Sequence, residues 1–318
     1  MINLQAMDFK LKFTPKSPNQ RFNYKQPMLL TGSCFADNIG DLLAKHQFNI
    51  LSQPNGVVYN PISIAQQIKQ IGEGIPYTEN DLHFYNELYH TWYHHTSFNS
   101  TSKSEVLQQI NATLTHANQF IHQPQTIVYV TFGSAFVYEL KDTLGFVVAN
   151  CHKYPQQNFN KRLLTVNEIL GCWQEVMTAL PHVQFVFTVS PVRHIKDGLF
   201  ENNVSKGILL QAVYELCKQQ NNAYYFPAYE VVVDELRDYR FYDTDLIHPT
   251  PQAIEYVWQQ LVKTCFDELT QQFIADVKAL NAMRNHRIMH QGTMTHDKFI
   301  EALKEKETRF NSTYNTSK

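Results

Sequence analysis

A single sharp turn near the start of the chain constrains the fold most. Residues 29–37 read Leu-Leu-Thr-Gly-Ser-Cys-Phe-Ala-Asp, so an apolar run stops at Thr31 and apolar residues at helical spacing begin with Phe35. This pattern predicts a strand that runs directly into a helix, and Gly32 provides the backbone freedom that so tight a turn needs. Ser33 then lies at the carboxyl end of the strand and at the start of the helix. Open α/β sheets bind their ligands at this position, and free backbone N–H groups there can hold an anion.

The rest of the chain repeats the alternation of strand and helix. Short runs of β-branched and aromatic residues predict strands, and segments with amphipathic spacing predict helices between them. Strands are expected at 9–13 (an edge strand), 48–51, 127–132, 183–189 and 224–226, a hairpin at 137–140 and 145–149, and helices at 35–45, from 61 onward, 103–122, 166–180, 203–219, 229–236 and 251–282. Such alternation predicts an α/β fold, a three-layer sandwich with a mostly parallel sheet and helices on both faces.

We expect a single domain over residues 1–318, with its core at about 25–285. Between the second and third strands of the sheet, residues 72–124 form a polar, aromatic-rich insertion. A connection that leaves the carboxyl end of a strand starts at the same edge as Ser33, so the insertion is expected to border the active-site mouth and to shape substrate choice. The alternative is that it only covers the outer helices. The C-terminal tail at about 285–318 is expected to be helical or polar, and its last residues, 311–318, are expected to fray.

The composition argues against several classes of function. A formal net charge of −2 gives no electrostatic basis for binding nucleic acid, and no apolar run approaches the ~18 residues that span a bilayer. Five cysteines without C-x-x-C spacing indicate free thiols in a reducing compartment, and the N-terminus lacks a signal-peptide pattern, so a cytoplasmic location is expected. No set of potential ligands has the spacing of a metal site, and neither a metal nor a cofactor is expected.

A second motif, far along the chain, supplies the partners that a nucleophilic serine needs. Asp245-Leu-Ile-His248-Pro249 precedes the last long predicted helix. The proline favours extended backbone at His248, and Asp245 can bind the imidazole, fix its tautomer and stabilise its protonated form. Ser33, His248 and Asp245 are therefore candidates for nucleophile, base and orienting carboxylate. The alternatives are that Ser33 only caps a helix, that Asp245 only caps a turn, and that His248 is a surface residue.

Several motifs resemble one known family. Residues 32–36, Gly-Ser-Cys-Phe-Ala, spell the signature of the GSCFA family, a branch similar to the SGNH (GDSL-type) hydrolases. Further stretches agree in order: Asn-Gly-Val-Val-Tyr-Asn-Pro at 55–61, Thr-Phe-Gly-Ser-Ala at 131–135, Ser-Pro-Val-Arg-His at 190–194 and Tyr-Arg-Phe-Tyr at 239–242. The resemblance runs from about residue 29 to the helix after His248. It implies an SGNH or flavodoxin-like fold in which Ser33 is the nucleophile.

The resemblance also implies where a developing oxyanion would be held. The SGNH pattern uses the backbone N–H of the nucleophile, a glycine after the second strand and an asparagine after the third. Ser33 and Gly56 match the first two positions, but an alanine stands where the asparagine is expected. Ser134 is expected to donate instead, with Asn60 and Asn150 as alternatives, because losing one such donor typically costs ~10²–10³ in rate.

A few residues near the expected site are candidates for substrate contacts. Asn60, Asn150, His152 and Arg193 lie close to these motifs or follow predicted strands. Arg193 could hold a carboxylate or phosphate of the substrate, and a structural salt bridge is the alternative for it. Cys34 is expected to be a small buried residue that points away from the nucleophile.

The family resemblance implies a serine-dependent esterase that needs no metal. Its expected substrate is an O-acyl ester of a small molecule or a glycan, which includes carbohydrate O-acetyl esters. An acyltransferase with a hydroxyl acceptor and a catalytically silent binding module of the same fold stay open, and the missing asparagine favours the latter. A metal-dependent phosphoesterase is a further alternative, and a chelator would abolish its activity.

Overall fold

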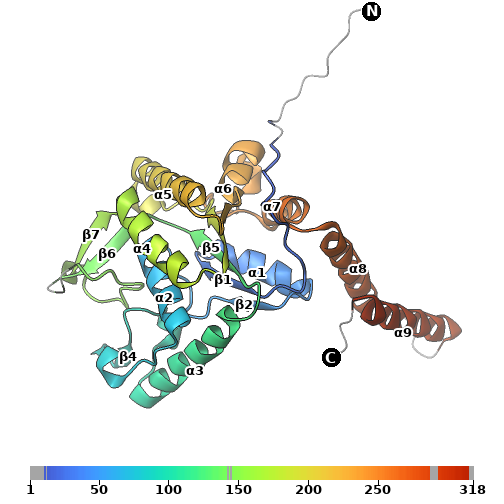
Figure 1. Cartoon of the computed structure of the whole chain (residues 1–318), viewed down its shortest axis with the longest axis horizontal. Helices are drawn as coiled ribbons and strands as arrows, with labels where there is room; N and C mark the ends of the chain where they lie inside the picture. Colours follow the sequence, from blue (N-terminus) through green and yellow to red (C-terminus); the bar gives the residue numbers. More distant parts are fainter. Residues whose placement is uncertain (1–10, 12, 142, 144, 287–292, 315–318) are drawn as a thin grey trace, which may run out of the picture.

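A parallel β-sheet forms the centre of the computed structural model, which describes residues 11, 13–141, 143, 145–286 and 293–314 (Figure 1). The described residues place five strands in this sheet in the order β2-β1-β5-β8-β9, and every neighbouring pair is parallel. The strands are β1 (Met28–Gly32), β2 (Ile50–Ser52), β5 (Ile127–Phe132), β8 (Gln184–Val189) and β9 (Ala223–Tyr225). The order is that of flavodoxin-like doubly wound folds, whose chain direction across the sheet reverses between the first and third strands. Here that point lies between β1 and β5.

Alternate residues of the central strands enter two separate hydrophobic cores. In β5, Val128, Val130 and Phe132 pack on one face, and Ile127 and Tyr129 pack on the other. Helices α2 (Pro61–Glu73), α4 (Val166–Ala179) and α5 (Leu199–Gln219) cover the first face, with α3 (Lys103–Ile121) packed against α2. Helices α1 (Phe35–Lys45) and α7 (Pro251–Cys265) cover the second face (Figure 1). The predicted three-layer α/β sandwich is therefore confirmed.

Side-chain caps explain where several helices begin. The Asn60 carboxamide oxygen accepts a hydrogen bond from the Ser63 N–H at 2.8 Å, and Pro61 follows at the first helical position. Thr165 and Glu168 form a capping box at the start of α4. Thr250 caps α7 in the same way as Asn60 caps α2. Helix α1 differs, because its N-cap residue is Cys34 and no side chain caps it.

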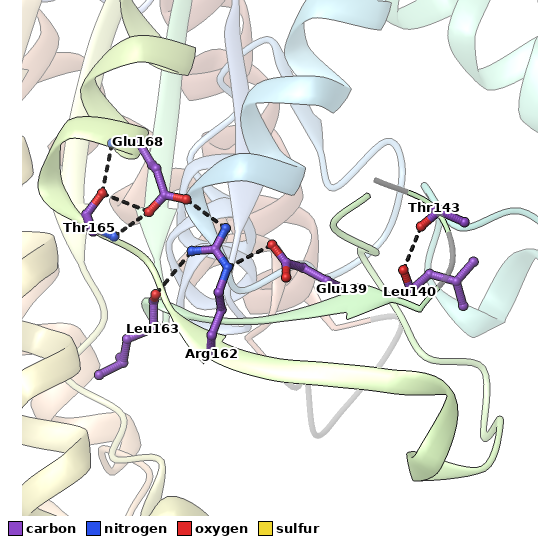
Figure 2. Close-up of polar contacts among 7 residues, drawn as sticks. All are labelled: Glu139, Leu140, Thr143, Arg162, Leu163, Thr165 and Glu168. Carbon is purple, nitrogen blue, oxygen red and sulfur yellow. Dashed lines mark hydrogen bonds and ion pairs between the residues drawn. The ribbon is translucent and has the colours of Figure 1, made fainter. Parts of the chain in front are cut away.

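An antiparallel hairpin extends from the carboxyl edge of the sheet. Strand β6 (Phe136–Leu140) pairs with β7 (Phe159–Leu163), and residues 146–148 bond to the other edge of β6. The hairpin predicted within 137–149 is thus present as a short bridge, but the main partner of β6 comes later in the chain. Figure 2 shows how Arg162 joins Glu139 of β6 to Glu168 of α4, with nitrogen–oxygen distances of 2.7 Å for both pairs.

The C-terminal part of the chain corrects two expectations. The helix predicted at 251–282 is two helices, because α7 ends at Cys265 and α8 (Glu268–Arg284) starts after the N-cap Asp267. Phe22 of the N-terminal arm pairs with Phe266 at this break, exchanging backbone hydrogen bonds with the residues on either side of Phe266. Such a contact between distant segments is invisible to periodicity.

The second correction concerns the tail. Residues 294–314 form helix α9 (Met294–Tyr314), which packs along α8 (Figure 1). Phe310 and Tyr314, four residues apart, bury their rings against Phe273 at centroid distances of 5.6 and 5.0 Å. The tail is therefore helical over 294–314, and the fraying expected from 311 onward does not hold for residues 311–314, since two aromatic residues on one helix face suffice to dock the segment.

Smaller differences remain. Helix α5 begins four residues earlier than predicted, and the helix expected at 229–236 is α6 (Ala228–Glu230) continued by one π-helical turn, Val231–Leu236. The insertion contains a short hairpin, β3 (His83–Tyr85) with β4 (Leu88–His90), before α3. The edge strand expected at 9–13 lies mostly outside the described residues. Within the described ranges, no helix combines the length and the apolar character needed to cross a bilayer.

Candidate active site

A cavity of about 610 Å³ opens at the carboxyl edge of the sheet, beside the switch point between β1 and β5. Its size suits a small ligand, or one end of a larger one. It is lined by the N-cap of α1, the residues before α2, the loop after β5, the β6–β7 hairpin with residues 148–151, the loop after β8, and the segment that precedes α7. The residues are Cys34, Tyr59, Asn60, Ser134, Phe136, Tyr138, Val148, Ala149, Asn150, Cys151, Lys161, Val192, Arg193, His194, Ile195, Lys196, Asp197, Ile247 and His248.

Gly32 fixes the turn that carries Ser33. Its φ is +122°, and a Cβ added there would lie 2.1 Å from the Thr131 carbonyl oxygen, so only glycine fits against β5. Ser33 is 1% exposed, and its backbone N–H donates to the Thr131 carbonyl at 3.0 Å. Its Oγ is buried without a hydrogen-bond partner among the described residues, so Ser33 is not a helix cap.

Tyr59 and Gly133 flank the Ser33 side chain. A Cβ on Gly133 would lie 3.2 Å from the Ser33 Cβ and 2.9 Å from the Tyr59 ring. Tyr59 is 41% exposed, and its ring meets the His194 ring edge-on at 5.5 Å. Ser33 itself is not among the cavity-lining residues, whereas its neighbour Cys34 is. The Ser33 hydroxyl therefore lies just behind the cavity wall.

Asp245 and His248 are joined side chain to side chain. The imidazole Nδ1 lies 2.6 Å from one carboxylate oxygen of Asp245, and the other oxygen accepts from the backbone N–H groups of Ile247 and His248 at 2.9 and 3.0 Å. These hydrogen bonds, led by the one from the His248 ring, lower the pKa of Asp245 to about 2. A charged Asp245 holds the proton of neutral His248 on Nδ1 and leaves Nε2 as the basic nitrogen.

The same loop presents His248 to the cavity from an exposed position. Leu246, between the two motif residues, adopts a φ of +60°, which is uncommon for a residue with a Cβ. The side chain of His248 is 51% exposed, and the residue lines the cavity. The Asp245 carboxylate thus caps the turn with one oxygen and binds the imidazole with the other. His248 makes no hydrogen bond to Ser33, whose Oγ has no partner.

The expected oxyanion donors are already bonded within the protein. The Ser33 N–H bonds to Thr131, and the Gly56 N–H donates to the Gln53 carbonyl at 2.9 Å. Gly56 also faces His95 of the insertion, whose Cβ would lie 2.3 Å from a Cβ added at Gly56, and it does not line the cavity. The structure therefore does not bring Gly56 to the site.

The third expected donor, Ser134, lines the cavity, and its hydroxyl has two partners within the protein. Its hydroxyl accepts from the Phe136 N–H at 3.1 Å and lies 3.4 Å from the Ser205 hydroxyl. The N–H groups of Gly133 and Ser134 both donate to the Tyr59 carbonyl, at 2.8 and 3.1 Å. This loop therefore forms part of the cavity wall, and its backbone N–H groups are not free to bind substrate because both donate to the Tyr59 carbonyl.

Cys34 differs from the expectation of a buried packing residue. It is half-buried and lines the cavity, and the N–H groups of Cys34 and Phe35 point toward its sulfur. Burial, aided by the nearby Asp37 carboxylate, raises the pKa of the Cys34 thiol. A thiol with a raised pKa stays protonated near neutral pH and is a poor nucleophile there.

The four expected substrate contacts fall into two groups. Asn150 and Arg193 line the cavity, and the Arg193 guanidinium lies 4.9 Å from the Tyr242 ring centroid. Asn60 also borders the cavity, but its carboxamide is committed to capping α2. His152 points away: its Nε2 bonds to the Thr91 carbonyl at 2.8 Å and its ring lies 4.2 Å from that of His90. Burial lowers the pKa of His152 to about 3, so it is a neutral packing residue.

The insertion at 72–124 contributes no residue to this cavity. Its helix α3 covers α2, and Trp92 packs behind the hairpin against Val148 and Phe159. The expectation that its aromatic residues form the cavity wall was wrong. The wall is made by the β6–β7 hairpin, which the insertion supports from outside.

Lys206 was missed in the sequence, whereas His194, in the motif at 190–194, was expected beside Arg193 as a residue that could face the substrate. Lys206 is fully buried in α5, and its ammonium donates to the carbonyls of Gly133 and Ser190, both at 2.7 Å. His194 lines the cavity, and its buried Nε2 has no hydrogen-bond partner in the described part of the chain; burial, followed by the charge of Lys206, lowers its pKa to about 4. A signal for Lys206 did exist, because it shares one helical face with Asn202, Leu209 and Val213.

The fold and the site together define the class of protein. This is a doubly wound α/β protein with a serine turn at the switch point of its sheet and an Asp–His pair at the mouth of the adjoining cavity. The model of the GSCFA family matches residues 27–261, from β1 into α7, and the chain belongs to the GSCFA family. No curated protein matches the sequence.

Proposed function

We propose that this protein is a serine-dependent hydrolase of O-acyl esters, with Ser33 as nucleophile, His248 as base and Asp245 as the orienting carboxylate. The observation that carries the proposal is the 2.6 Å hydrogen bond between Asp245 and His248 beside a cavity that also borders the Ser33 turn. The GSCFA family, which resembles the SGNH hydrolases, supports the same assignment.

The buried hydroxyl of Ser33 agrees with such a role. A buried polar group without a hydrogen-bond partner lowers the free energy of unfolding by about 1–3 kcal/mol, so the presence of such a hydroxyl at Ser33 calls for an explanation. In the proposed reaction the partner is His248 Nε2, which Ser33 Oγ meets once substrate is bound. Hydrogen bonds between catalytic groups are often long in free enzymes and tighten in the substrate complex. A small rotation of the exposed Tyr59 ring would open the way to Ser33.

The proposed chemistry proceeds in two halves. His248 Nε2 takes the hydroxyl proton as Ser33 Oγ attacks the acyl carbon, and the resulting tetrahedral intermediate expels the alcohol, which receives that proton. Water then attacks the acyl-enzyme by the same route and releases the acid. A hydroxyl acceptor in place of water would make the protein an acyltransferase.

The cavity lining bears on the substrate. Phe136, Tyr138 and Val148 provide apolar contact, and Lys161 is paired with Asp197. Arg193 packs on Tyr242 and forms no ion pair or hydrogen bond with another described residue. We therefore assign the acyl group to the apolar part and propose that Arg193 binds a polar or anionic group of the small-molecule or glycan ester.

Turnover of p-nitrophenyl acetate and of acetylated sugars by wild type, Ser33→Ala and His248→Ala tests the proposal. Each variant is expected to lose at least ~10³-fold in kcat while its melting temperature stays close to that of wild type. His286→Ala, an exposed histidine at the end of α8, is the control and should keep full activity. Substantial turnover by purified Ser33→Ala would remove the assignment.

A ligand-binding protein without turnover is the second candidate. It is favoured by one observation: the backbone N–H groups expected to hold an oxyanion are bonded to Thr131, Gln53 and Tyr59. Under this alternative, acetylated sugars would bind in the cavity by calorimetry and be recovered unchanged.

A further inference from the structure

Lys206 has an unusual environment for a lysine. Its side chain is 1% exposed, in the middle of α5, where the neighbouring positions on the same face are apolar or small. The ammonium donates to two backbone carbonyls, Gly133 O after β5 and Ser190 O after β8, both at 2.7 Å. An ammonium has three N–H groups, so these two contacts leave one more available.

No carboxylate compensates this charge within the described residues. The titratable groups that face Lys206 are Cys34 at the start of α1 and His194 in the loop after β8. The thiol pKa of Cys34 is raised and the pKa of His194 is lowered to about 4, both mainly by burial, so both groups are uncharged near neutral pH. A buried charge without a counter-charge is costly, and an apolar side chain of similar length would avoid that cost.

Gly133 connects the charge of Lys206 to the proposed nucleophile. Lys206 holds the carbonyl of Gly133, and the Cα of Gly133 faces Ser33 so closely that an added Cβ would lie 3.2 Å from the Ser33 Cβ. The backbone N–H groups of Ser33, Gly56 and Ser134 are not free to bind an oxyanion, because each already donates to a carbonyl within the protein. A fixed positive charge in a dry site stabilises developing negative charge without direct contact.

We propose that Lys206 is a positioning residue for the ester cleavage proposed above: its ammonium holds the Gly133 and Ser190 loops in place behind Ser33, and its charge stabilises the oxyanion of the tetrahedral intermediate. The inference rests on that proposed function. It assigns to a buried lysine the electrostatic role that the missing asparagine plays in the SGNH pattern.

The charge of Lys206 gives the inference a distinctive readout. Burial lowers the pKa of Lys206 to about 7, from an ordinary value of 10.5. The amine is therefore charged below that pH and neutral above it, and kcat is expected to fall as the pH rises through about 7. His248 must be unprotonated to act as base, so it produces only an acid limb, and the alkaline limb belongs to Lys206.

Two substitutions separate the charge from the hydrogen bonds. Lys206→Gln keeps N–H donors for the carbonyls without the charge, and Lys206→Met removes both. Lys218→Gln, at an exposed position of the same helix, is the matched control and should behave as wild type. The measurements are kcat and KM for p-nitrophenyl acetate from pH 5 to 9, together with the melting temperature of each variant.

Lys206→Gln is expected to lose roughly 10–100-fold in kcat, with KM changed by less than about threefold and the alkaline limb gone. Lys206→Met is expected to lose at least as much and to melt at a lower temperature. Wild-type kcat in Lys206→Gln with an unchanged alkaline limb would overturn the inference. If neither variant folds, the wild-type profile decides, and a kcat that stays flat from pH 6 to 9 overturns it.

The proposed function can fail separately. If Ser33→Ala turns over p-nitrophenyl acetate as fast as wild type, the ester-cleavage assignment fails, and the inference falls with it. If Ser33→Ala is inactive while Lys206→Gln matches wild type, only the role of Lys206 is wrong.

Discussion

The Ser33 turn and the Asp245–His248 loop are held in place by opposite means. The serine turn is buried between two strands, where a glycine backbone touches β5 and no other residue fits. The histidine loop is exposed, and hydrogen bonds from one carboxylate maintain its shape. A change at Gly32, which fixes the backbone of the serine turn, should therefore act on the whole fold, whereas changes in the histidine loop should act on the chemistry alone.

The largest expected effect is that of Gly32→Ala. A methyl group there would meet the Thr131 carbonyl oxygen at 2.1 Å, at a φ of +122° that alanine avoids, so the free energy of unfolding should fall by about 3–5 kcal/mol. Gly171→Ala is the matched control, because nothing lies within 4 Å of its added Cβ on α4, and it should stabilise by about 0.5–1 kcal/mol. Denaturant titration measures both. Equal stabilities for wild type and Gly32→Ala would mean that the turn is not fixed as described.

Asp245→Asn should leave stability unchanged and reduce kcat by on the order of 10²–10³-fold. The amide oxygen can still accept from the backbone N–H groups, but the amide N–H then faces His248 Nδ1 and places the ring proton on Nε2, where it blocks base catalysis. Asp243→Asn is the control in the same loop, because among the described residues the Asp243 carboxylate accepts a hydrogen bond only from the Thr244 N–H. Equal kcat values for the two variants would show that Asp245 does not set the tautomer.

Arg193→Gln tests the cavity between these two regions. Its guanidinium packs on Tyr242, six residues before His248, and faces the cavity without an anionic partner among the described residues. We expect KM to rise about tenfold for esters that carry a carboxylate or phosphate and to stay constant for neutral esters such as p-nitrophenyl acetate. An equal rise for both classes of ester would assign Arg193 to packing.

The smallest expected effect concerns the hairpin wall, where Arg162 joins Glu139 to Glu168 (Figure 2). Partial burial raises the pKa of Glu168, but hydrogen bonds from Arg162 and Thr165 outweigh it and lower the pKa from its ordinary 4.5 to about 2. The stability that this contributes is complete above about pH 4.5 and is lost as the pH falls toward 2. Because the pair is half-exposed, Glu168→Gln should cost less than about 1 kcal/mol at pH 6, and progressively less as the pH falls through about 2.

The control for that comparison is Glu175→Gln, an exposed glutamate of the same helix that pairs with Lys69 at 3.4 Å. Its stability difference from wild type should be close to zero at both pH values. A pH-independent deficit in Glu168→Gln would indicate lost packing rather than lost charge.

The same contrast explains what the sequence could predict. The central strands are short apolar runs whose alternate residues enter two cores, so the sheet followed from periodicity. The Asp245–His248 bond is local, three residues apart, and it was expected because the pair follows the Ser33 motif in the chain. The break between α7 and α8 depends on Phe22, which pairs with a residue more than two hundred positions away.

The sequence could not show which hydrogen-bond donors of the site are free, because this depends on the folded backbone. Whether the Gly56 N–H is free depends on a turn to Gln53, and Gly133 and Ser134 share the Tyr59 carbonyl across a long stretch of chain. The role of Lys206 depends on carbonyls in two loops that only the folded sheet brings together. Motif spacing names the residues of a site, and tertiary hydrogen bonding decides which of their groups are available.

Mass spectrometry after treatment with a fluorophosphonate tests the central claim most directly. The account predicts one phosphonyl adduct per folded chain, mapped by peptide analysis to Ser33 and absent from Ser33→Ala and His248→Ala. Cys34, which lines the cavity beside Ser33, is the informative alternative site, and Cys34→Ala should label as wild type does. An adduct on Cys34, or no adduct on folded wild-type protein, would contradict the assignment of Ser33 as nucleophile.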